Sequence, residues 1–555
     1  MKTLLAILFL IGSFTSLFAQ AELVKDIFTG FDNTTSSAPQ NLIDINGVVY
    51  YSAFTDYGRE LWKSDGTSAG TVLVKDINAG ENASNPTELT NVNGTLFFSA
   101  NDGVNGDMLW KSDGTASGTV IVGTGFFAPQ YLTNVNGTLF FNANNGINGV
   151  ELWKSDGTTA GTVLVKDIIS GSGGAYPQSL TNVNGTLFFR ANDGINGDEL
   201  WKSDGTTAGT VLVKDINIGA SSGFPQFLTN VNGTLFFSAN NGVNGVELWK
   251  SDGTTAGTVL VKDIVSWANS NPNKLMNVNG VLFFIANDQV NGFELWKSDG
   301  TAVGTVLVKD IMAGSGTSNP DNLVNVNGLL YFCAADANGK EIWKSNGTVA
   351  GTIMVKDIRP GSISCNPWNL LNVNGQLYFT ADDGFYGGEL WKSDGSIAGT
   401  IMVKDIYSGV GDGAGSYLTN VNGELFFSAS DGVNGNELWK SDGTTAGTVL
   451  VKDIFSIALN ADPQFLTNVN GTLFFNANNG INGYELWKSD GTTAGTFLVK
   501  DISAGISSSG PQNFTNVNGT LFFSANNGLN GNELWKSDGT TAGTVLVKEI
   551  SNGTN

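Results

Sequence analysis

The sequence contains no histidine, only two cysteines and only three arginines among 555 residues. Without histidine, the chain cannot build a Ser-His-Asp triad, a histidine-ligated zinc site or a histidine acid–base catalyst. The two cysteines, Cys333 and Cys365, are too few for a disulfide framework and lack the spacing of a metal knuckle. The arginines, Arg59, Arg190 and Arg359, are scattered, whereas sialidase-like chemistry would need a cluster to bind a substrate carboxylate.

Charged residues are also scarce, at 14% of the chain, and they leave a formal net charge of −22. Apart from Lys2, nearly every lysine falls in one of two fixed positions of a repeat, so no basic patch stands apart. Because nucleic-acid binding needs concentrated positive charge, a nucleic-acid partner is not expected.

The N-terminus has the layout of a secretion signal. Lys2 precedes a nearly continuous apolar run from Leu4 to Phe18, and small residues follow at Ala19 and Ala21. The run fits a signal-peptide core better than a membrane span or a buried helix or strand. We predict a signal peptide over residues 1–19, with a cut after Ala21 as the alternative. The mature chain, residues 20–555, is then secreted, held at the cell surface or periplasmic, and no membrane span is expected.

One unit recurs along the rest of the chain, and each copy contains one tryptophan. The intervals between these tryptophans are 48 residues or slightly fewer, with one of 43. A repeat of this length predicts a solenoid, a propeller or an array. The repeated tryptophans are Trp62, Trp110, Trp153, Trp201, Trp249, Trp296, Trp343, Trp391, Trp439, Trp487 and Trp535.

Each unit predicts four antiparallel strands. In the last unit these are Asn513 to Val517, Thr520 to Ala525, Glu533 to Ser537 and Thr544 to Ile550, with a tight Asn-Gly hairpin between the first two. The second and fourth strands are apolar on both faces, which is typical of blades covered by neighbours on both sides. We therefore predict an all-β propeller of eleven four-stranded blades. A β-solenoid, two smaller propellers and an open array are the alternatives.

Ring closure is not settled by the repeat count. Leu23 to Ile27 repeats the fourth strand before the first complete unit, so twelve fourth strands accompany eleven sets of the other three. The 43-residue interval replaces the usual Lys-Asp-Ile with Gly123-Thr124-Gly125, and so short a crossover argues against a domain boundary there.

The repeated string ELWKSDGT resembles the ELWxxDGT repeat family of secreted bacterial proteins, over nearly all of the mature chain. Departures are Met108 for Glu, Ile342 for Leu, Asn346 for Asp and Ser396 for Thr. The resemblance implies export and a propeller-like array, and it brings no known activity.

The repeated tryptophans are interpreted as structural, because a residue that packs every blade must recur in every blade. The aspartate of each SDGT, such as Asp65, is expected to bind its own turn backbone. Nothing marks one pair of glutamates among many as catalytic, so no catalytic residue is assigned.

Two kinds of loop are candidate sites. The loop AN(D/N)GxNG is rich in oxygen ligands, and calcium is the only cofactor considered, against a plain hairpin loop. Its acidic candidates are Asp102, Asp193, Asp288 and Asp431.

The crossovers between units vary and carry aromatic residues that could stack on sugars or anchor a protein, unless they pack into the core. The candidates are Phe126, Phe127, Tyr176, Phe224, Trp267, Trp368 and Tyr417. Export would also permit a disulfide between Cys333 and Cys365.

We interpret the chain as a secreted, non-enzymatic binding or adhesion protein that recognises an extracellular glycan or protein through these variable loops. The alternative is a structural protein of an extracellular matrix or surface layer, stabilised by calcium. A carbohydrate-active enzyme ranks third.

Overall fold

The computed structural model describes residues 40–548, apart from residues 56–57, 66–71, 81, 414–416, 453–459 and 530. The expected signal peptide and the strand expected at Leu23 to Ile27 lie outside these residues. The described part of the chain contains strands and turns and no helix. Accordingly, no described segment is a helix of the length and apolarity that crossing a membrane requires.

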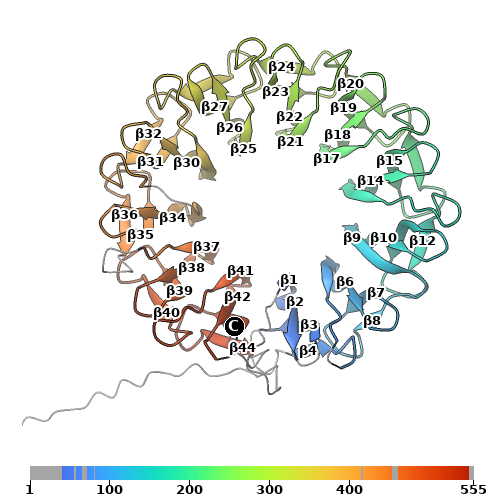
Figure 1. Ribbon diagram of the computed structural model, residues 1–555, viewed down its shortest axis with the longest axis horizontal. Coiled ribbons are helices and arrows are strands. Elements are labelled where there is room, and N and C mark those ends of the chain that lie inside the picture. Colours follow the sequence, from blue (N-terminus) through green and yellow to red (C-terminus); the bar gives the residue numbers. More distant parts are fainter. Residues whose placement is uncertain are drawn as a thin grey trace, which may run out of the picture.

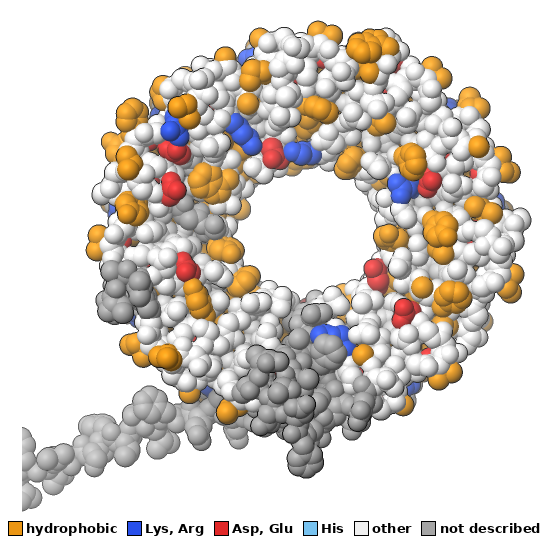
Figure 2. Space-filling view, in the orientation of Figure 1, with side chains coloured by type: hydrophobic (Ala, Val, Ile, Leu, Met, Phe, Trp, Pro, Cys, Tyr) orange, Lys and Arg blue, Asp and Glu red, His pale blue; other side chains and the backbone are white. Residues whose placement is uncertain are grey.

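The described strands form eleven four-stranded antiparallel sheets, each built from consecutive strands. Figure 1 shows these sheets as blades arranged around one ring, with the first strand of each blade innermost. Figure 2 shows that the centre of the ring is an open channel. The predicted eleven-bladed β-propeller is therefore confirmed, and the solenoid, the pair of propellers and the open array are not observed.

We number the blades 1 to 11 along the chain and call the four strands of a blade A to D from the channel outward. The A strands are β1 Gln40–Ile45, β5 Thr87–Val92, β9 Phe127–Val135, β13 Gln178–Val183, β17 Gln226–Val231, β21 Asn273–Val278, β25 Asp321–Val326, β29 Trp368–Val373, β33 Thr419–Val421, β37 Gln464–Val469 and β41 Gln512–Val517. The B strands are β2 Val48–Thr55, β6 Thr95–Asn101, β10 Thr138–Asn144, β14 Thr186–Asn192, β18 Thr234–Asn240, β22 Val281–Asn287, β26 Leu329–Asp336, β30 Gln376–Asp382, β34 Glu424–Ser430, β38 Thr472–Asn478 and β42 Thr520–Asn526.

The outer half of each blade repeats in the same way. The C strands are β3 Gly58–Ser64, β7 Asp107–Ser112, β11 Val150–Ser155, β15 Asp198–Ser203, β19 Val246–Ser251, β23 Phe293–Ser298, β27 Gly339–Ser345, β31 Gly388–Ser393, β35 Asn436–Ser441, β39 Tyr484–Ser489 and β43 Asn532–Ser537. The D strands are β4 Val72–Lys75, β8 Val120–Ile121, β12 Val163–Lys166, β16 Val211–Lys214, β20 Val259–Lys262, β24 Val306–Lys309, β28 Ile353–Lys356, β32 Ile401–Lys404, β36 Val449–Lys452, β40 Phe497–Lys500 and β44 Val545–Lys548.

The hydrophobic core lies between blades. Successive side chains of a strand point to opposite faces, so the two adjacent aromatic residues of each B strand, mostly phenylalanines, pack against two different neighbours. In blade 4, Phe188 joins the core shared with blade 5, whereas Phe189 joins the core shared with blade 3. This explains why the sequence shows no polar face on these strands.

The repeated tryptophans fill the blade interfaces, and each is only 1–7% exposed. A lysine at the end of the preceding D strand lies over most of the described rings. Lys214 Nζ is 6.0 Å from the centroid of the Trp249 ring, and it donates a hydrogen bond of 2.9 Å to the carbonyl oxygen of Thr258. Because the repeat length is nearly constant, this lysine links neighbouring blades in the same way along the ring, by a cation–π contact and a hydrogen bond.

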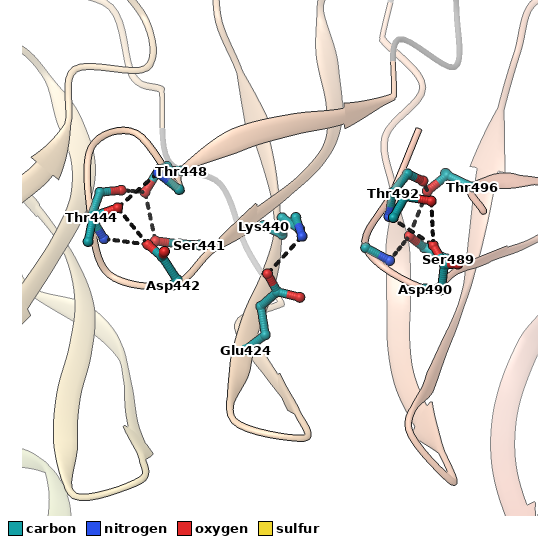
Figure 3. A network of polar contacts seen from close by, with 12 residues as sticks. Glu424, Lys440, Ser441, Asp442, Thr444, Thr448, Ser489, Asp490, Thr492 and Thr496 are labelled. Carbon is teal, nitrogen blue, oxygen red and sulfur yellow. Dashed lines mark hydrogen bonds and ion pairs between the residues drawn. The ribbon is translucent and has the colours of Figure 1, made fainter. Parts of the chain in front are cut away.

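The SDGT segments form tight turns between strands C and D. Figure 3 shows two copies, in which Asp442 and Asp490 accept hydrogen bonds within their own turns. The Asp442 Oδ1 atom accepts from the Thr444 amide at 2.8 Å and from the Thr444 hydroxyl at 2.7 Å. These aspartates are therefore occupied in holding the turn.

In eight of the described blades, the glutamate of the ELW segment holds the crossover that leads to the next blade. In blade 4, the Glu199 carboxylate accepts backbone N–H bonds from Ile216, Asn217 and Gly223 at 2.7–3.0 Å. Burial raises the pKa of Glu199 to about 7. A single side chain thereby satisfies three donors that the crossover would otherwise leave unpaired.

Blade 2 departs from this arrangement. Met108 stands in place of the glutamate, and residues 122–128, which lead to blade 3, are five fewer than the equivalent residues 165–176 after blade 3. Phe126 fills the interface instead, with ring centroids 4.8 Å from Trp153 and 5.6 Å from Phe141. The loss of the carboxylate therefore accompanies the loss of the amides that it would bind.

The ring closes where blade 11 meets blade 1. One core cluster joins Tyr51 and Trp62 of blade 1 to Phe522 and Val547 of blade 11. Between other neighbouring blades, the asparagine of one A–B hairpin packs against the glycine of the next hairpin, as Asn46 does against Gly94. The same contact joins blade 11 to blade 1, where the Asn518 side chain packs against Gly47. This closing interface uses the same packing as the others.

Candidate ligand-binding site in the channel wall

The A strands form the channel wall, and nearly all carry a β-bulge. In blade 5, two residues of β17, Phe227 and Leu228, oppose the single residue Phe237 of β18. The extra residue, Phe227, has a φ of 55°, a left-handed conformation that is strained for a large side chain. Such strain is retained where the surrounding structure enforces it, and it occurs preferentially at functional sites.

The chemical character of the bulge residue changes from blade to blade, as does that of the residue before it, which is Thr87, Asp321 or Trp368 in place of the usual glutamine. The residues after it follow a nearly constant pattern of Leu-Thr-Asn-Val, whereas the bulge residue is acidic, basic, aromatic or amide-bearing. The equivalent residue has φ between 51° and 66° in all eleven blades, although in blade 9 it precedes β33 and no bulge occurs within that strand. These eleven residues are Asn41, Glu88, Tyr131, Ser179, Phe227, Lys274, Asn322, Asn369, Tyr417, Phe465 and Asn513.

Aromatic side chains form a continuous row on one arc of the wall. The Tyr417 and Phe465 ring centroids are 6.3 Å apart, and those of Phe465 and Phe514 are 6.2 Å apart. The Phe514 ring in turn packs against the buried Phe523 ring, with 5.7 Å between the ring centroids, and this contact anchors the row to the core of blade 11. We call these three side chains, Tyr417, Phe465 and Phe514, the aromatic row.

Two grooves accompany the aromatic row. A groove of about 380 Å³ lies between blades 9, 10 and 11, and one of about 450 Å³ lies between blades 8 and 9. The first is lined by Tyr417, Leu418, Thr419, Phe465, Leu466, Thr467, Asn513 and Phe514. The second is lined by Asn369, Leu370, Leu371, Tyr417 and Leu418. None of these side chains is charged, so the grooves suit an uncharged ligand with apolar groups.

A third groove on the wall differs in its chemistry. It has a volume of about 370 Å³, lies between blades 1 and 2, and includes Glu88 beside Asn41 and Leu89. The Glu88 carboxylate accepts a hydrogen bond of 3.3 Å from the Leu132 amide. The wall is therefore acidic on one arc and aromatic and uncharged on another.

The structure separates the aromatic residues that the sequence analysis grouped as one recognition surface. Phe126 is 2% exposed, so its assignment as a surface contact is wrong: the short crossover draws it into the core. Phe127, Tyr176, Phe224 and Trp267 are exposed but belong to different crossovers.

Trp368 is only partly exposed, at the start of β29. Tyr417 alone among the seven lines the grooves of the aromatic row.

The acidic loop residues are held within their own loops. The Asp102 Oδ1 atom accepts the amides of Val104 and Asn105, and its Oδ2 atom accepts the Asn105 side-chain amide. Asp193, Asp288 and Asp431 make the same contacts. Among the residues that the structure describes, no three acidic or cysteine side chains group as metal ligands. Calcium binding gains no support from this geometry.

Cys333 and Cys365 are free thiols, so the disulfide considered from the sequence is not formed. Both lie in the core between blades 7 and 8. The Cys333 thiol donates a hydrogen bond of 3.3 Å to the Pro367 carbonyl oxygen, and burial raises its pKa to about 12. Both cysteines therefore serve as buried core residues, and the Cys333 sulfur is hydrogen-bonded to the backbone.

Phe465 and Phe514 are not among the residues predicted from the sequence, because that prediction rests on variation between repeats in the crossovers alone. A signal was available within the repeat. The residue before the constant Leu-Thr-Asn-Val changes from Glu88 to Lys274 to Phe465, although the residues after it barely change.

Comparisons with known proteins yield distant structural similarity only. No protein-family profile and no curated protein matches the chain. The tricorn protease is 11% identical with a TM-score of 0.25, covering 88% of this chain and 47% of that one. A prolyl endopeptidase is 12% identical with a TM-score of 0.31, covering 65% and 55%. The GH74 enzyme of Niastella koreensis is 12% identical with a TM-score of 0.24, covering 96% and 87%.

The chain spans about half the length of the two peptidases. The matched proteins are enzymes, which contradicts our interpretation of the chain as a non-enzymatic binding or adhesion protein, and that interpretation is not retained. TM-scores of 0.24–0.31 transfer neither a substrate nor a mechanism to this chain.

Proposed function

We propose that the ring holds an extended polypeptide against the wall of its channel, with the aromatic row as the contact surface. The observation that carries this proposal is the row itself, three ring side chains on three adjacent blades with grooves between them. All three members lie at or beside residues with a strained, left-handed φ, which fix them without further ordering on binding.

The spacing of the row favours a peptide in the extended conformation. Side chains on one face of an extended chain recur every ~6.4–6.8 Å, because the rise is ~3.2–3.4 Å per residue. The ring centroids are 6.2–6.3 Å apart, so alternate side chains of such a peptide match the row in step. The absence of charge among the lining residues favours apolar side chains at those alternate positions.

The test compares one bulge residue inside the row with one outside it. Phe465→Asn removes a ring yet keeps a residue that tolerates left-handed φ, and blades 8 and 11 already carry asparagine there. Phe227→Asn is the matched control, since Phe227 is also an aromatic bulge residue, is more exposed than the partly buried Phe465, and lies on blade 5.

Fluorescence anisotropy of a labelled peptide with alternating leucine and threonine measures the affinity. We expect Phe465→Asn to weaken binding by ~10–100-fold, as for other aromatic contacts at the centre of an interface, and Phe227→Asn to leave it unchanged. Failure of the unmodified protein to bind, equal losses in both variants, or binding of a neutral oligosaccharide in place of the peptide would refute the proposal.

A further inference from the structure

A second surface of the molecule is apolar in a regular way. The B–C loops, which join strands B and C, consist mainly of asparagine, aspartate and glycine, but their central residue is aliphatic or aromatic. Among the described loops, nine such central residues are 63–87% exposed, from Val104 to Val290 on blades 2 to 6 and from Phe385 to Leu529 on blades 8 to 11. We call these nine residues the loop tips.

The loop tips are held rigidly. The Val104 amide donates to Asp102 Oδ1 at 2.9 Å, and the flanking Gly103 and Asn105 amides are bonded to the same loop. Ile481 is held in the same way by the Oδ1 atom of Asn479 at 3.0 Å. Each loop therefore presents an apolar side chain to solvent in one conformation, so little entropy is lost when that side chain is buried.

The loop tips share one face of the ring. The crossovers bond to the same ends of the blades, as when the Tyr176 amide donates to the carbonyl oxygen of Val150, at the start of its C strand. The hairpins between strands A and B and the SDGT turns lie at the opposite ends, because the strands alternate in direction. Figure 2 shows apolar side chains spread around the part of the ring that is not drawn in grey, rather than gathered in one patch.

Two blades interrupt the circle of loop tips. In blades 1 and 7, strands B and C are separated by only two residues in place of the five found in the other blades, so these loops lack the central position that forms a tip elsewhere. In blade 7 the two residues are Ala337 and Asn338, whereas residues 56–57 of blade 1 lie outside the described part of the chain. Figure 1 shows blades 1 and 7 on nearly opposite sides of the ring. The loop tips thus form two arcs, one of five on blades 2 to 6 and one of four on blades 8 to 11.

We propose that this face is a self-association surface, on which a second copy of the ring stacks face to face. Two arcs separated by opposite gaps superimpose on themselves when one ring is turned over about a two-fold axis in the plane of the face, which is the geometry of an isologous dimer. A Val, Ile or Leu side chain carries on the order of 100 Å² of apolar surface. Nine of them approach the ~800 Å² per partner of a standard interface.

The charge of the loops around the tips favours a second copy of the chain over a lipid surface as the partner. The loops around the tips contain no lysine, arginine or tryptophan, the residues that accompany membrane contact, and five contain an aspartate beside the tip. The same aspartates and the net charge of −22 oppose stacking at low salt. Screening therefore strengthens the dimer as the salt concentration rises.

Sedimentation velocity of the purified full chain, over a range of protein and salt concentrations, tests the proposal. The test variant combines Val104→Asn, Ile147→Asn, Ile195→Asn, Val243→Asn and Val290→Asn. The control combines Val303→Asn, Val349→Asn and Ile397→Asn, which change aliphatic residues of the SDGT turns that are 66–89% exposed on the opposite face. All eight positions are exposed, so circular dichroism should show unchanged folding.

We expect the unmodified protein and the control to form a dimer that strengthens with salt, and the five-residue variant to dissociate at least ~100-fold more readily. A monomer under all conditions, or a dimer that the five-residue variant leaves intact, would overturn the proposal. Binding to zwitterionic lipid vesicles that the five-residue variant abolishes would also overturn it, because the loop tips would then face lipid.

Discussion

Phe126 and Phe127 are neighbours in the chain with opposite surroundings. The first packs against Trp153 and Phe141 between blades 2 and 3, and the second begins β9 with its side chain partly in solvent. At the scale of one residue, the direction of a side chain depends on the length of the crossover that carries it. The shortened crossover of blade 2 places Phe126 over the tryptophan that a lysine covers elsewhere.

The first prediction compares these two residues. Phe126→Ala should destabilise the protein by ~3–5 kcal/mol, because it removes a buried ring and leaves a cavity. Phe127→Ala should change stability by less than ~0.5 kcal/mol, since its side chain is half exposed. Chemical denaturation measures both, and similar losses in the two variants would contradict the packing described here.

At the scale of the element, the crossover and the ELW glutamate form one unit. Glu151 accepts the amides of Ile168, Ile169 and Ala175, whereas the short crossover after blade 2 faces Met108. A carboxylate without these donors would be buried unpaired, and the donors without a carboxylate would be unpaired as well.

The second prediction follows from this pairing. Met108→Glu alone should destabilise the fold by ~2 kcal/mol or more, because blade 2 offers no matching amides. Replacing residues 122–128 with residues 165–176, the long crossover of blade 3, should restore stability to the Met108→Glu chain. Thermal denaturation of the single and combined variants measures the coupling, and additive effects would show that the two features are independent.

The elements themselves were predictable from the sequence, whereas the wall site was not. The Asn-Gly hairpins and SDGT turns bound each strand, so the strands expected around Trp535 agree with β41 to β44 to within about two residues at each end. The bulge at Phe465 leaves no trace in the hydrophobic pattern, because one extra residue shifts only the partner alignment. Burial of Phe126 likewise depends on a neighbouring blade that local sequence does not specify.

At the scale of the molecule, the buried glutamates act together. Burial raises the pKa of Glu294 and Glu341 to about 7 and that of Glu485 to about 8, from an ordinary value of 4.5. The folded protein therefore binds more protons than the unfolded chain between these values. The stability that protonation contributes is complete below about pH 4.5 and is lost as the pH rises through 7 to 8.

The third prediction is a higher melting temperature, by several degrees, at pH 5 than at pH 8. The SDGT aspartates do not oppose this trend, since hydrogen bonds from Thr206 lower the pKa of Asp204 and keep it ionised across that range. Combining Glu199→Gln, Glu294→Gln and Glu341→Gln should flatten the dependence in calorimetry. A melting temperature that falls on acidification to pH 5 would show that the carboxylates are ionised in the folded ring.

The closing interface between blades 11 and 1 has a consequence for how such rings vary. It repeats the packing found between the other blades, so among the described residues no contact specifies the number eleven. Adding or removing one unit would alter the angle between neighbours by only a few degrees, shared among all interfaces. Duplication or deletion of a single repeat in the gene could therefore yield another closed ring with a wider or narrower channel.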